Sequence, residues 1–107
     1  MIELRRYQLE DTRTPITEWL SSLRDARARA QIEVRLRRVS AGNFGDCKSV
    51  GDGISELRID IGGGYRVYYG KHGLELVLLL CGGNKGSQQS DIALAKTYWA
   101  DWKRRNS

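Results

Sequence analysis

The sequence predicts an α+β domain in which an N-terminal strand and a two-helix hairpin precede a three-stranded antiparallel meander and a C-terminal helix. Three observations predict this fold. Residues 14–41 carry apolar side chains at helical spacing, residues 54–81 alternate between apolar and charged side chains around two glycine turns, and residues 90–105 return to helical spacing. The expected order is β-α-α-β-β-β-α. A chain of 107 residues suits a single domain, 1–107, with one core.

The first elements are a short strand and a helix. Ile2–Leu9 (IELRRYQL) roughly alternates and is expected to join the main sheet. Thr14 and Pro15 then open a helix, because threonine is a favoured N-cap and proline fits the first helical position. The apolar stripe of this helix is Ile16, Trp19, Leu20 and Leu23.

A second helix is expected over Asp25–Ala41. Its alanines and arginines favour helix, and Gly42 is a suitable C-terminal stop. Ile32, Val34 and Leu36 alternate with charged residues and would also suit a strand. We prefer helix because favourable propensities continue over more than twelve residues.

Glycine turns divide the central part of the chain. Asn43–Gly53 has three glycines and is expected to be a loop, whereas Gly62–Gly64 and Gly70–Gly73 join strands as hairpin turns. Three strands are expected: Ile54–Ile61, Tyr65–Tyr69 and Leu74–Cys81. Because side chains alternate between the faces of a strand, one face of the sheet should be apolar and the other should present arginines, a tyrosine and a carboxylate.

The last element is a helix that Ser87 or Ser90 can cap, with Lys103–Arg105 in its last turn. Its apolar side is Ile92, Ala95, Tyr98, Trp99 and Trp102. In this arrangement all the helices are expected to cover the same face of the sheet.

Composition limits the classes of function. The 18 basic and 13 acidic residues give a net charge of +5, which suits a polyanionic partner. Cys47 and Cys81 lack metal-ligand spacing, so we expect reduced thiols and neither a metal nor a cofactor. The charged N-terminus does not resemble a signal peptide, and the longest apolar run, Leu76–Cys81, is too short to cross a bilayer. A cytoplasmic location without membrane contact is expected.

Candidate chemistry lies on the polar face of the meander. Arg58 and Arg66 are on adjacent strands, and Lys85 follows the last strand, so three cations could meet at one end of the sheet. The alternative is a solvated face with cross-strand ion pairs, such as Glu56 with Arg66. The single histidine, His72, lies in a predicted turn and favours no histidine-based catalysis.

These cations would suit RNA cleavage. RNA carries its own nucleophile, the 2′-hydroxyl, so a nuclease can act by positioning it and by stabilising negative charge on the phosphate. Arginine suits the second task because it stays charged and donates two hydrogen bonds to phosphate oxygens. Glu56, Tyr68 or a lysine could be the general base, and the sequence leaves these alternatives open.

Three segments resemble the RelE superfamily of bacterial toxins, and more closely its HigB-like "addiction module killer protein" branch, which is related to the phage Gp49-like proteins. They are Glu56–Arg58 (ELR), Gly64–Tyr69 (GYRVYY) and Leu79–Gln88 (LLCGGNKGSQ), the last followed by Asp91-Ile92. The resemblance implies a toxin of a type II toxin–antitoxin system that inhibits translation by cleaving mRNA on the ribosome. It also implies a helix-turn-helix antitoxin (HigA-like) as partner, with DNA contact only as the toxin–antitoxin complex.

The resemblance also implies functional residues. Arg66 matches a phosphate-contacting arginine, Lys85 falls where these toxins place a second cation, and Arg58 lies on the strand that carries catalytic lysines in RelE. The C-terminal tyrosine of RelE and the histidine cluster of some HigB toxins have no counterpart here. The complete set of candidates is Arg66, Lys85, Arg58, Glu56 and Tyr68 for catalysis, with Lys48, Gln88, Arg35 and Arg38 for RNA binding.

Two other hypotheses use the same residues differently. The chain could be a non-catalytic module whose sheet face binds RNA or an acidic antitoxin segment. Alternatively, the arginine-rich helix Arg24–Arg38 could contact DNA, although a solvated face or a docking surface for antitoxin or ribosome is the expected role.

Overall fold

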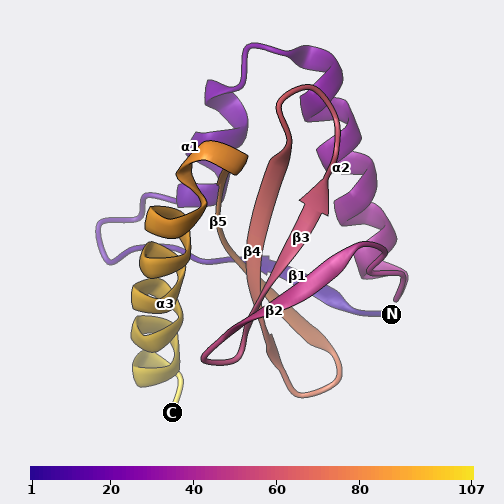
Figure 1. Cartoon of the computed structure of the whole chain (residues 1–107). Helices are drawn as coiled ribbons and strands as arrows, with labels where there is room; N and C mark the ends of the chain where they lie inside the picture. The colour runs from indigo at the N-terminus through magenta and orange to yellow at the C-terminus, as the bar shows by residue number, and fades with distance from the viewer.

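The computed structural model describes residues 1–107 and contains three α-helices and a five-stranded mixed sheet (Figure 1). In chain order the elements are β1 (Glu3–Arg6), α1 (Pro15–Ser22), α2 (Ala26–Ser40), β2 (Cys47–Gly51), β3 (Ile54–Ile59), β4 (Tyr65–His72), β5 (Leu76–Asn84), a 3-10 turn η1 (Lys85–Ser87) and α3 (Gln88–Arg105). The strands lie in the order β1-β5-β4-β3-β2, with β1 parallel to β5 and the other pairs antiparallel. The predicted α+β class is therefore confirmed.

The main difference in topology is strand β2, which lies within the segment expected to be a loop. β2 pairs with β3 through the two-residue turn Asp52-Gly53, whose φ angles are +56° and +80°. Asp-Gly is a strong hairpin signal because both residues tolerate positive φ. The glycines of this segment thus close a hairpin, and the element order is β-α-α-β-β-β-β-α.

The helices cover both faces of the sheet, so the expectation that they share one face was wrong. Figure 1 shows α2 and α3 on opposite sides of the sheet. One core cluster joins α1 and α2 to the strands through residues such as Leu20, Leu36 and Val67. A second cluster joins α3 to the other face through residues that include Tyr68 and Trp99. The face predicted to be polar and open therefore lies partly beneath α3.

Two strand glycines let tryptophan rings approach the sheet. A Cβ on Gly82 would lie 2.3 Å from the nearest ring carbon of Trp19, and a Cβ on Gly70 would lie 2.7 Å from that of Trp99. Such distances are well inside van der Waals contact, so only glycine fits at these positions. Gly82 thus seats α1 on one face of the sheet, and Gly70 seats α3 on the other.

Helix α2 begins at an aspartate cap. The carboxylate of Asp25 accepts hydrogen bonds from the backbone N–H groups of Arg27 and Ala28, at 3.0 and 3.1 Å. Capping satisfies two donors that otherwise lack a partner at a helix start, and it stabilises a helix by about 1 kcal/mol. The cap fixes where the arginine-rich helix starts.

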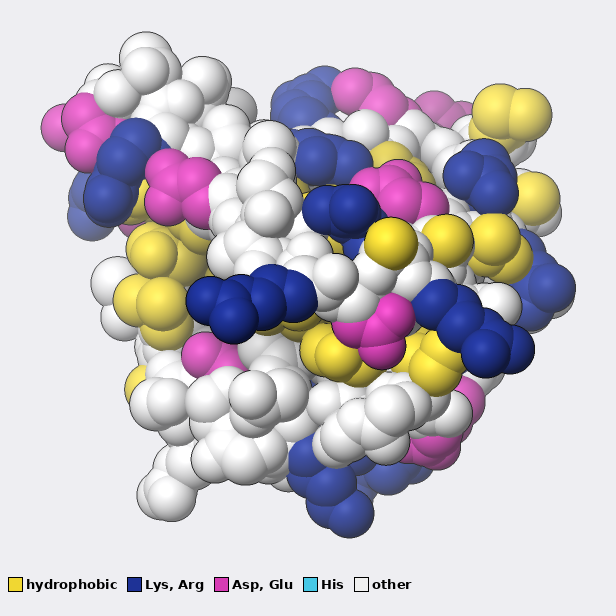
Figure 2. Space-filling view, turned by 90° about the horizontal axis from the view of Figure 1, so that it is seen from above, with side chains coloured by type: hydrophobic (Ala, Val, Ile, Leu, Met, Phe, Trp, Pro, Cys, Tyr) yellow, Lys and Arg dark blue, Asp and Glu magenta, His cyan; other side chains and the backbone are white.

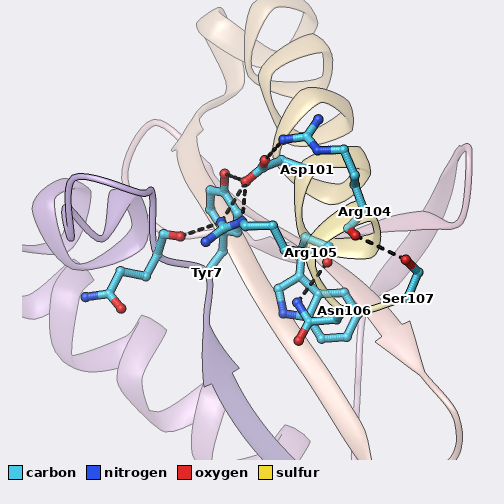
Figure 3. A network of polar contacts seen from close by, with 8 residues as sticks. Tyr7, Asp101, Arg104, Arg105, Asn106 and Ser107 are labelled. Atoms are coloured by element: carbon cyan, nitrogen blue, oxygen red, sulfur yellow. Dashed lines mark hydrogen bonds and ion pairs between the residues drawn. The ribbon is translucent and has the colours of Figure 1, made fainter.

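A polar network holds the C-terminal end of α3 against the N-terminal segment (Figure 3). The buried Tyr7 hydroxyl donates to Oδ2 of Asp101 at 2.6 Å, and Nη2 of Arg105 donates to the same oxygen at 2.6 Å. Arg105 Nη2 also donates to the carbonyl of Gln8 at 2.7 Å. Burial and the Asp101 carboxylate raise the pKa of Tyr7 to about 12. Asp101 thus connects residues from both ends of the chain.

The Asp101 network makes stability depend on pH. The hydrogen bond from Tyr7, helped by Arg105, lowers the pKa of Asp101 below its ordinary value of 3.8. A carboxyl group whose pKa is lower in the folded state stabilises the fold above its unfolded pKa, and this contribution is lost as pH falls through the folded pKa. Asp101→Asn should therefore lower the thermal midpoint at pH 7, and its difference from wild type should shrink below about pH 4.

The matched control is Glu10→Gln, which removes an exposed carboxylate that makes no ion pair or side-chain hydrogen bond. Its midpoint should follow wild type across the same pH range. A constant deficit for Asp101→Asn from pH 7 down to pH 2 would show that the carboxylate charge contributes nothing.

Candidate functional site

The candidate site lies where the β3–β4 hairpin meets the start of α3. Glu56 is opposite Tyr68 in the register of β3 and β4, and Arg58 is opposite Arg66. Nε of Arg66 lies 3.9 Å from Oε1 of Glu56. Both residues are buried, with 6% of Arg66 and 1% of Glu56 exposed. A guanidinium and a carboxylate therefore form an ion pair within the fold.

Further groups surround this pair. Nε2 of Gln88, the first residue of α3, donates to Oε2 of Glu56 at 2.9 Å. Nη1 of Arg66 donates to the carbonyl of Tyr65 at 3.0 Å and lies 3.7 Å from Oδ1 of Asp60, whose side chain is 77% exposed. Arg66 thus connects a buried carboxylate to one at the surface.

Lys85 borders the same corner. Its backbone N–H donates to the carbonyl of Gly64 at 3.2 Å. A Cβ on Gly64 would lie 3.6 Å from Cβ of Lys85 and 3.7 Å from Nη1 of Arg66. The lysine and the arginine therefore flank one turn, and the exposed Lys85 has no ion-pair partner.

Tyr68 contributes a buried phenol. Neither its hydroxyl nor Nε of Arg66 has a hydrogen-bond partner within the protein. Burial raises the pKa of Tyr68, and the carboxylates of Glu56 and Asp91 raise it further. The phenol therefore stays protonated at neutral pH and can donate a hydrogen bond, but it is a poor base. Among the predicted bases, this leaves Glu56 or a lysine.

The turn after β5 contains a group of residues that sequence reasoning missed. Ser87 donates its hydroxyl hydrogen to Asp91 Oδ2 and its backbone N–H to Asn84 Oδ1. A Cβ on Gly83 would lie 1.8 Å from Oδ2 of Asp91, so only glycine allows this carboxylate to rest on the strand. The two consecutive glycines at the end of an apolar strand are the signal that could have revealed this close approach.

Cys81, on the same strand, is not a reactive thiol. Its Sγ donates to the carbonyl of Asp91 at 3.6 Å. Burial, followed by the charge of Asp91, raises the pKa of Cys81 to about 12. The thiolate is therefore scarce at neutral pH, and Cys81 has a packing role.

Two further predicted residues, Arg58 and Arg35, are held by other partners. Arg58 is on the same face as Arg66, but its Nη2 lies 3.3 Å from Oδ1 of Asp46. The guanidinium of Arg35 donates to the carbonyls of Arg58, Phe44 and Asp46 and so anchors the segment before β2. The predicted meeting of Arg58 with Arg66 and Lys85 is thus only partly realised, because Asp46 draws the Arg58 guanidinium away.

Two predicted RNA-binding residues remain exposed. Lys48 on β2 is opposite Glu56 in the register, so the two side chains start from the same face. Arg38 lies on α2, which covers the opposite face of the sheet. Of these two, only Lys48 is placed beside the Glu56–Arg66 pair.

The surface around the site is of mixed charge. Seen from above, lysine and arginine side chains are interspersed with carboxylates and apolar groups (Figure 2). The surface cavities of the molecule are lined by other residues than Glu56, Arg66 and Tyr68. The Glu56–Arg66 pair is thus buried and lines none of these cavities.

Comparison with known proteins defines the family of the chain. Over 89 residues it is 54% identical to an uncharacterized protein of Haemophilus influenzae, a match that covers 83% of this chain and 89% of that protein. The chain therefore belongs to the same family as the Haemophilus protein. No family model matches the chain. None of its helices is both long and apolar enough to span a membrane, and no three His, Cys, Asp or Glu side chains are grouped as metal ligands.

Proposed function

We propose that this chain is the toxin of a type II toxin–antitoxin system, a HigB-like member of the RelE superfamily. It cleaves mRNA without a metal ion, on the translating ribosome in the cytoplasm, and so inhibits translation. The observation that carries the proposal is the Glu56–Arg66 pair, with Nε to Oε1 at 3.9 Å, beside Lys85 and the Tyr68 phenol. These four side chains can supply a base, two cations and a neutral donor.

The proposed reaction is attack of the 2′-hydroxyl on the adjacent phosphorus. Glu56 accepts the hydroxyl proton, while Arg66 stabilises the charge that develops on the phosphate oxygens. Lys85 gives a proton to the departing 5′ oxygen, and Tyr68 can donate to a phosphate oxygen. The bond to the 5′ oxygen breaks as the bond to the 2′ oxygen forms, so the products are a 2′,3′-cyclic phosphate and a 5′-hydroxyl end.

RNA reaches this site only after a local rearrangement. Arg66 is 6% exposed, and Gln88 donates to Glu56 above it. Substrate binding therefore requires Gln88 to leave Glu56, and the phosphate replaces Asp60 as the outer partner of Arg66. The exposed Asp60 is the easier partner to exchange, because surface ion pairs contribute about 0–1 kcal/mol.

A second candidate function follows from the same burial. Because Arg66 is already paired with Glu56 and Asp60, the site could be a structural ion pair in a non-catalytic module that binds RNA or an antitoxin. The absence of a tyrosine or histidine in Gln88–Asp91 also favours this candidate.

Mapping the ends of cellular mRNA separates the two functions. After induction of the chain alone, growth should stop and primer extension should find discrete new 5′ ends in mRNA. Co-expression of a helix-turn-helix protein encoded by the adjacent gene should restore growth and remove these ends. Growth arrest without new 5′ ends would support the binding module and contradict the nuclease.

A further inference from the structure

The surplus positive charge of the protein lies on one helix. The segment Arg24–Arg38 contains six of the 18 basic residues and only two of the 13 acidic residues, Asp25 and Glu33. Six positive and two negative charges leave +4 here, out of a net charge of +5 for the chain. The rest of the molecule is therefore almost neutral.

The two acids of this segment already have partners. Asp25 caps α2 through two backbone N–H groups, and Oε1 of Glu33 lies 3.9 Å from Nη2 of Arg6. Arg35 is occupied with three backbone carbonyls. The remaining arginines of the segment make no ion pair and no side-chain hydrogen bond, whereas every arginine elsewhere in the chain makes at least one. These unpaired arginines are Arg24, Arg27, Arg29, Arg37 and Arg38.

The helix directs two of these arginines to one outer surface. Its buried side packs on the sheet through residues such as Ile32 and Leu36. Arg27 and Arg38 are exposed and lie eleven residues apart, which is about three turns and about 16 Å along the axis. They therefore point in nearly the same direction, with the exposed Gln31 between them. We call Arg27, Gln31 and Arg38 the α2 ridge.

The chemistry of the α2 ridge indicates its partner. Residues 24–40 contain no aromatic or histidine side chain, so this helix offers no surface on which unpaired bases could stack. Its outer apolar residues are Ala26, Ala30 and Val34, too small to anchor a protein interface. Unpaired guanidinium groups match phosphate oxygens well. We infer that the α2 ridge binds the phosphate backbone of double-helical RNA.

That the ligand is RNA and not DNA rests on the proposed function. That the ligand is a duplex and not a single strand rests on the lack of aromatic side chains on the helix. The α2 ridge and the Glu56–Arg66 pair belong to opposite faces of the sheet, because α2 and α3 cover opposite faces. A duplex on the α2 ridge therefore leaves the cleavage site free. The ridge would hold a folded part of an RNA while a single strand enters the site.

The test is the affinity of the purified full chain for a 20-base-pair RNA duplex, measured by fluorescence anisotropy. The double variant Arg27→Gln/Arg38→Gln should bind about tenfold more weakly, and the slope of log K against log salt should fall by about 2. The matched control, Arg5→Gln/Arg13→Gln, removes the same charge from exposed arginines that pair with Glu3 and Asp11, and it should bind like wild type.

Single-stranded RNA and a DNA duplex of the same sequence complete the experiment. Wild type should prefer the RNA duplex to both. The inference would be overturned if both double variants lost the same affinity for the RNA duplex, or if the ridge variant bound it like wild type. Wild-type binding to the DNA duplex as tight as to the RNA duplex would also overturn it. Discrete mRNA cleavage with unchanged duplex binding would leave the proposed function standing. Duplex binding that needs the α2 ridge, without any cleavage, would refute only the nuclease.

Discussion

Arg66→Gln should lower the rate of the proposed RNA cleavage by about 10²–10³-fold, because in the proposed mechanism Arg66 is the cation that opposes the charge growing on the phosphate. In cells this variant should no longer stop growth when it is expressed alone. The rate is best measured on a short RNA that carries a mapped cleavage site. Arg58→Gln is the matched control, since Arg58 is opposite Arg66 in the register but pairs with Asp46.

Folding must be measured alongside activity, because Arg66 is also a structural partner. Removing one member of a buried ion pair leaves Glu56 unpaired and costs about 3–5 kcal/mol of stability. Arg66→Lys keeps a positive charge beside Glu56 but loses the two-pronged phosphate contact, so it should fold and still cleave slowly. A folded Arg66 variant with full activity would rule out this residue as the phosphate-binding group.

Gly82→Ala should destabilise the fold by about 3 kcal/mol. The new methyl group would lie 2.3–2.7 Å from three ring carbons of Trp19. Neither element can easily move away, because β5 lies between β1 and β4 and α1 is anchored in the core through Ile16 and Leu20. Urea unfolding should show a lower midpoint with an unchanged slope.

Gly63→Ala is the control for this change, because a Cβ at Gly63 meets nothing within 4 Å. Its unfolding midpoint should match wild type. Combining Gly82→Ala with Trp19→Ala should cost less than the sum of the two single changes, since the clash disappears with the ring. If Gly82→Ala is as stable as Gly63→Ala, Trp19 does not pack on the strand as described.

Local patterns predicted most of the elements. Helical spacing identified α1 and α3, and the Asp25–Ala41 prediction agrees closely with α2, Ala26–Ser40. The missed strand β2 depended on whether Asp52-Gly53 closes a hairpin or belongs to a loop, and its neighbouring glycines obscured that signal. In the structure, the Asp52-Gly53 turn forms a hairpin even though the segment is rich in glycine.

The wrong face for α3 has a different cause. Alternation places Glu56 and Arg66 on one side of the strands, but an alternating charged position looks the same whether it is solvated or buried in an ion pair. Only the packing of α3, through Trp99 over Gly70, decides that this side is covered. This contact joins residues that are far apart in the sequence, and the local spacing of apolar residues cannot predict such a contact.

The candidate site could be predicted from the sequence only in part. Strand register follows from alternation and turns, so the pairing of Glu56 with Arg66 was within reach of the sequence. The diversion of Arg58 to Asp46 and of Arg35 to backbone carbonyls depends on how the segment before β2 folds back. These contacts remove two predicted residues from the site.

The most direct test of a metal-free ribonuclease is cleavage of a short RNA in which one nucleotide, immediately 5′ of the cleaved bond, lacks its 2′-hydroxyl. This single change should block cleavage there. Unmodified RNA, cleaved in the presence of EDTA, should yield a 2′,3′-cyclic phosphate and a 5′-hydroxyl end. Continued cleavage of the 2′-deoxy substrate, or a 3′-hydroxyl product, would contradict the proposed mechanism.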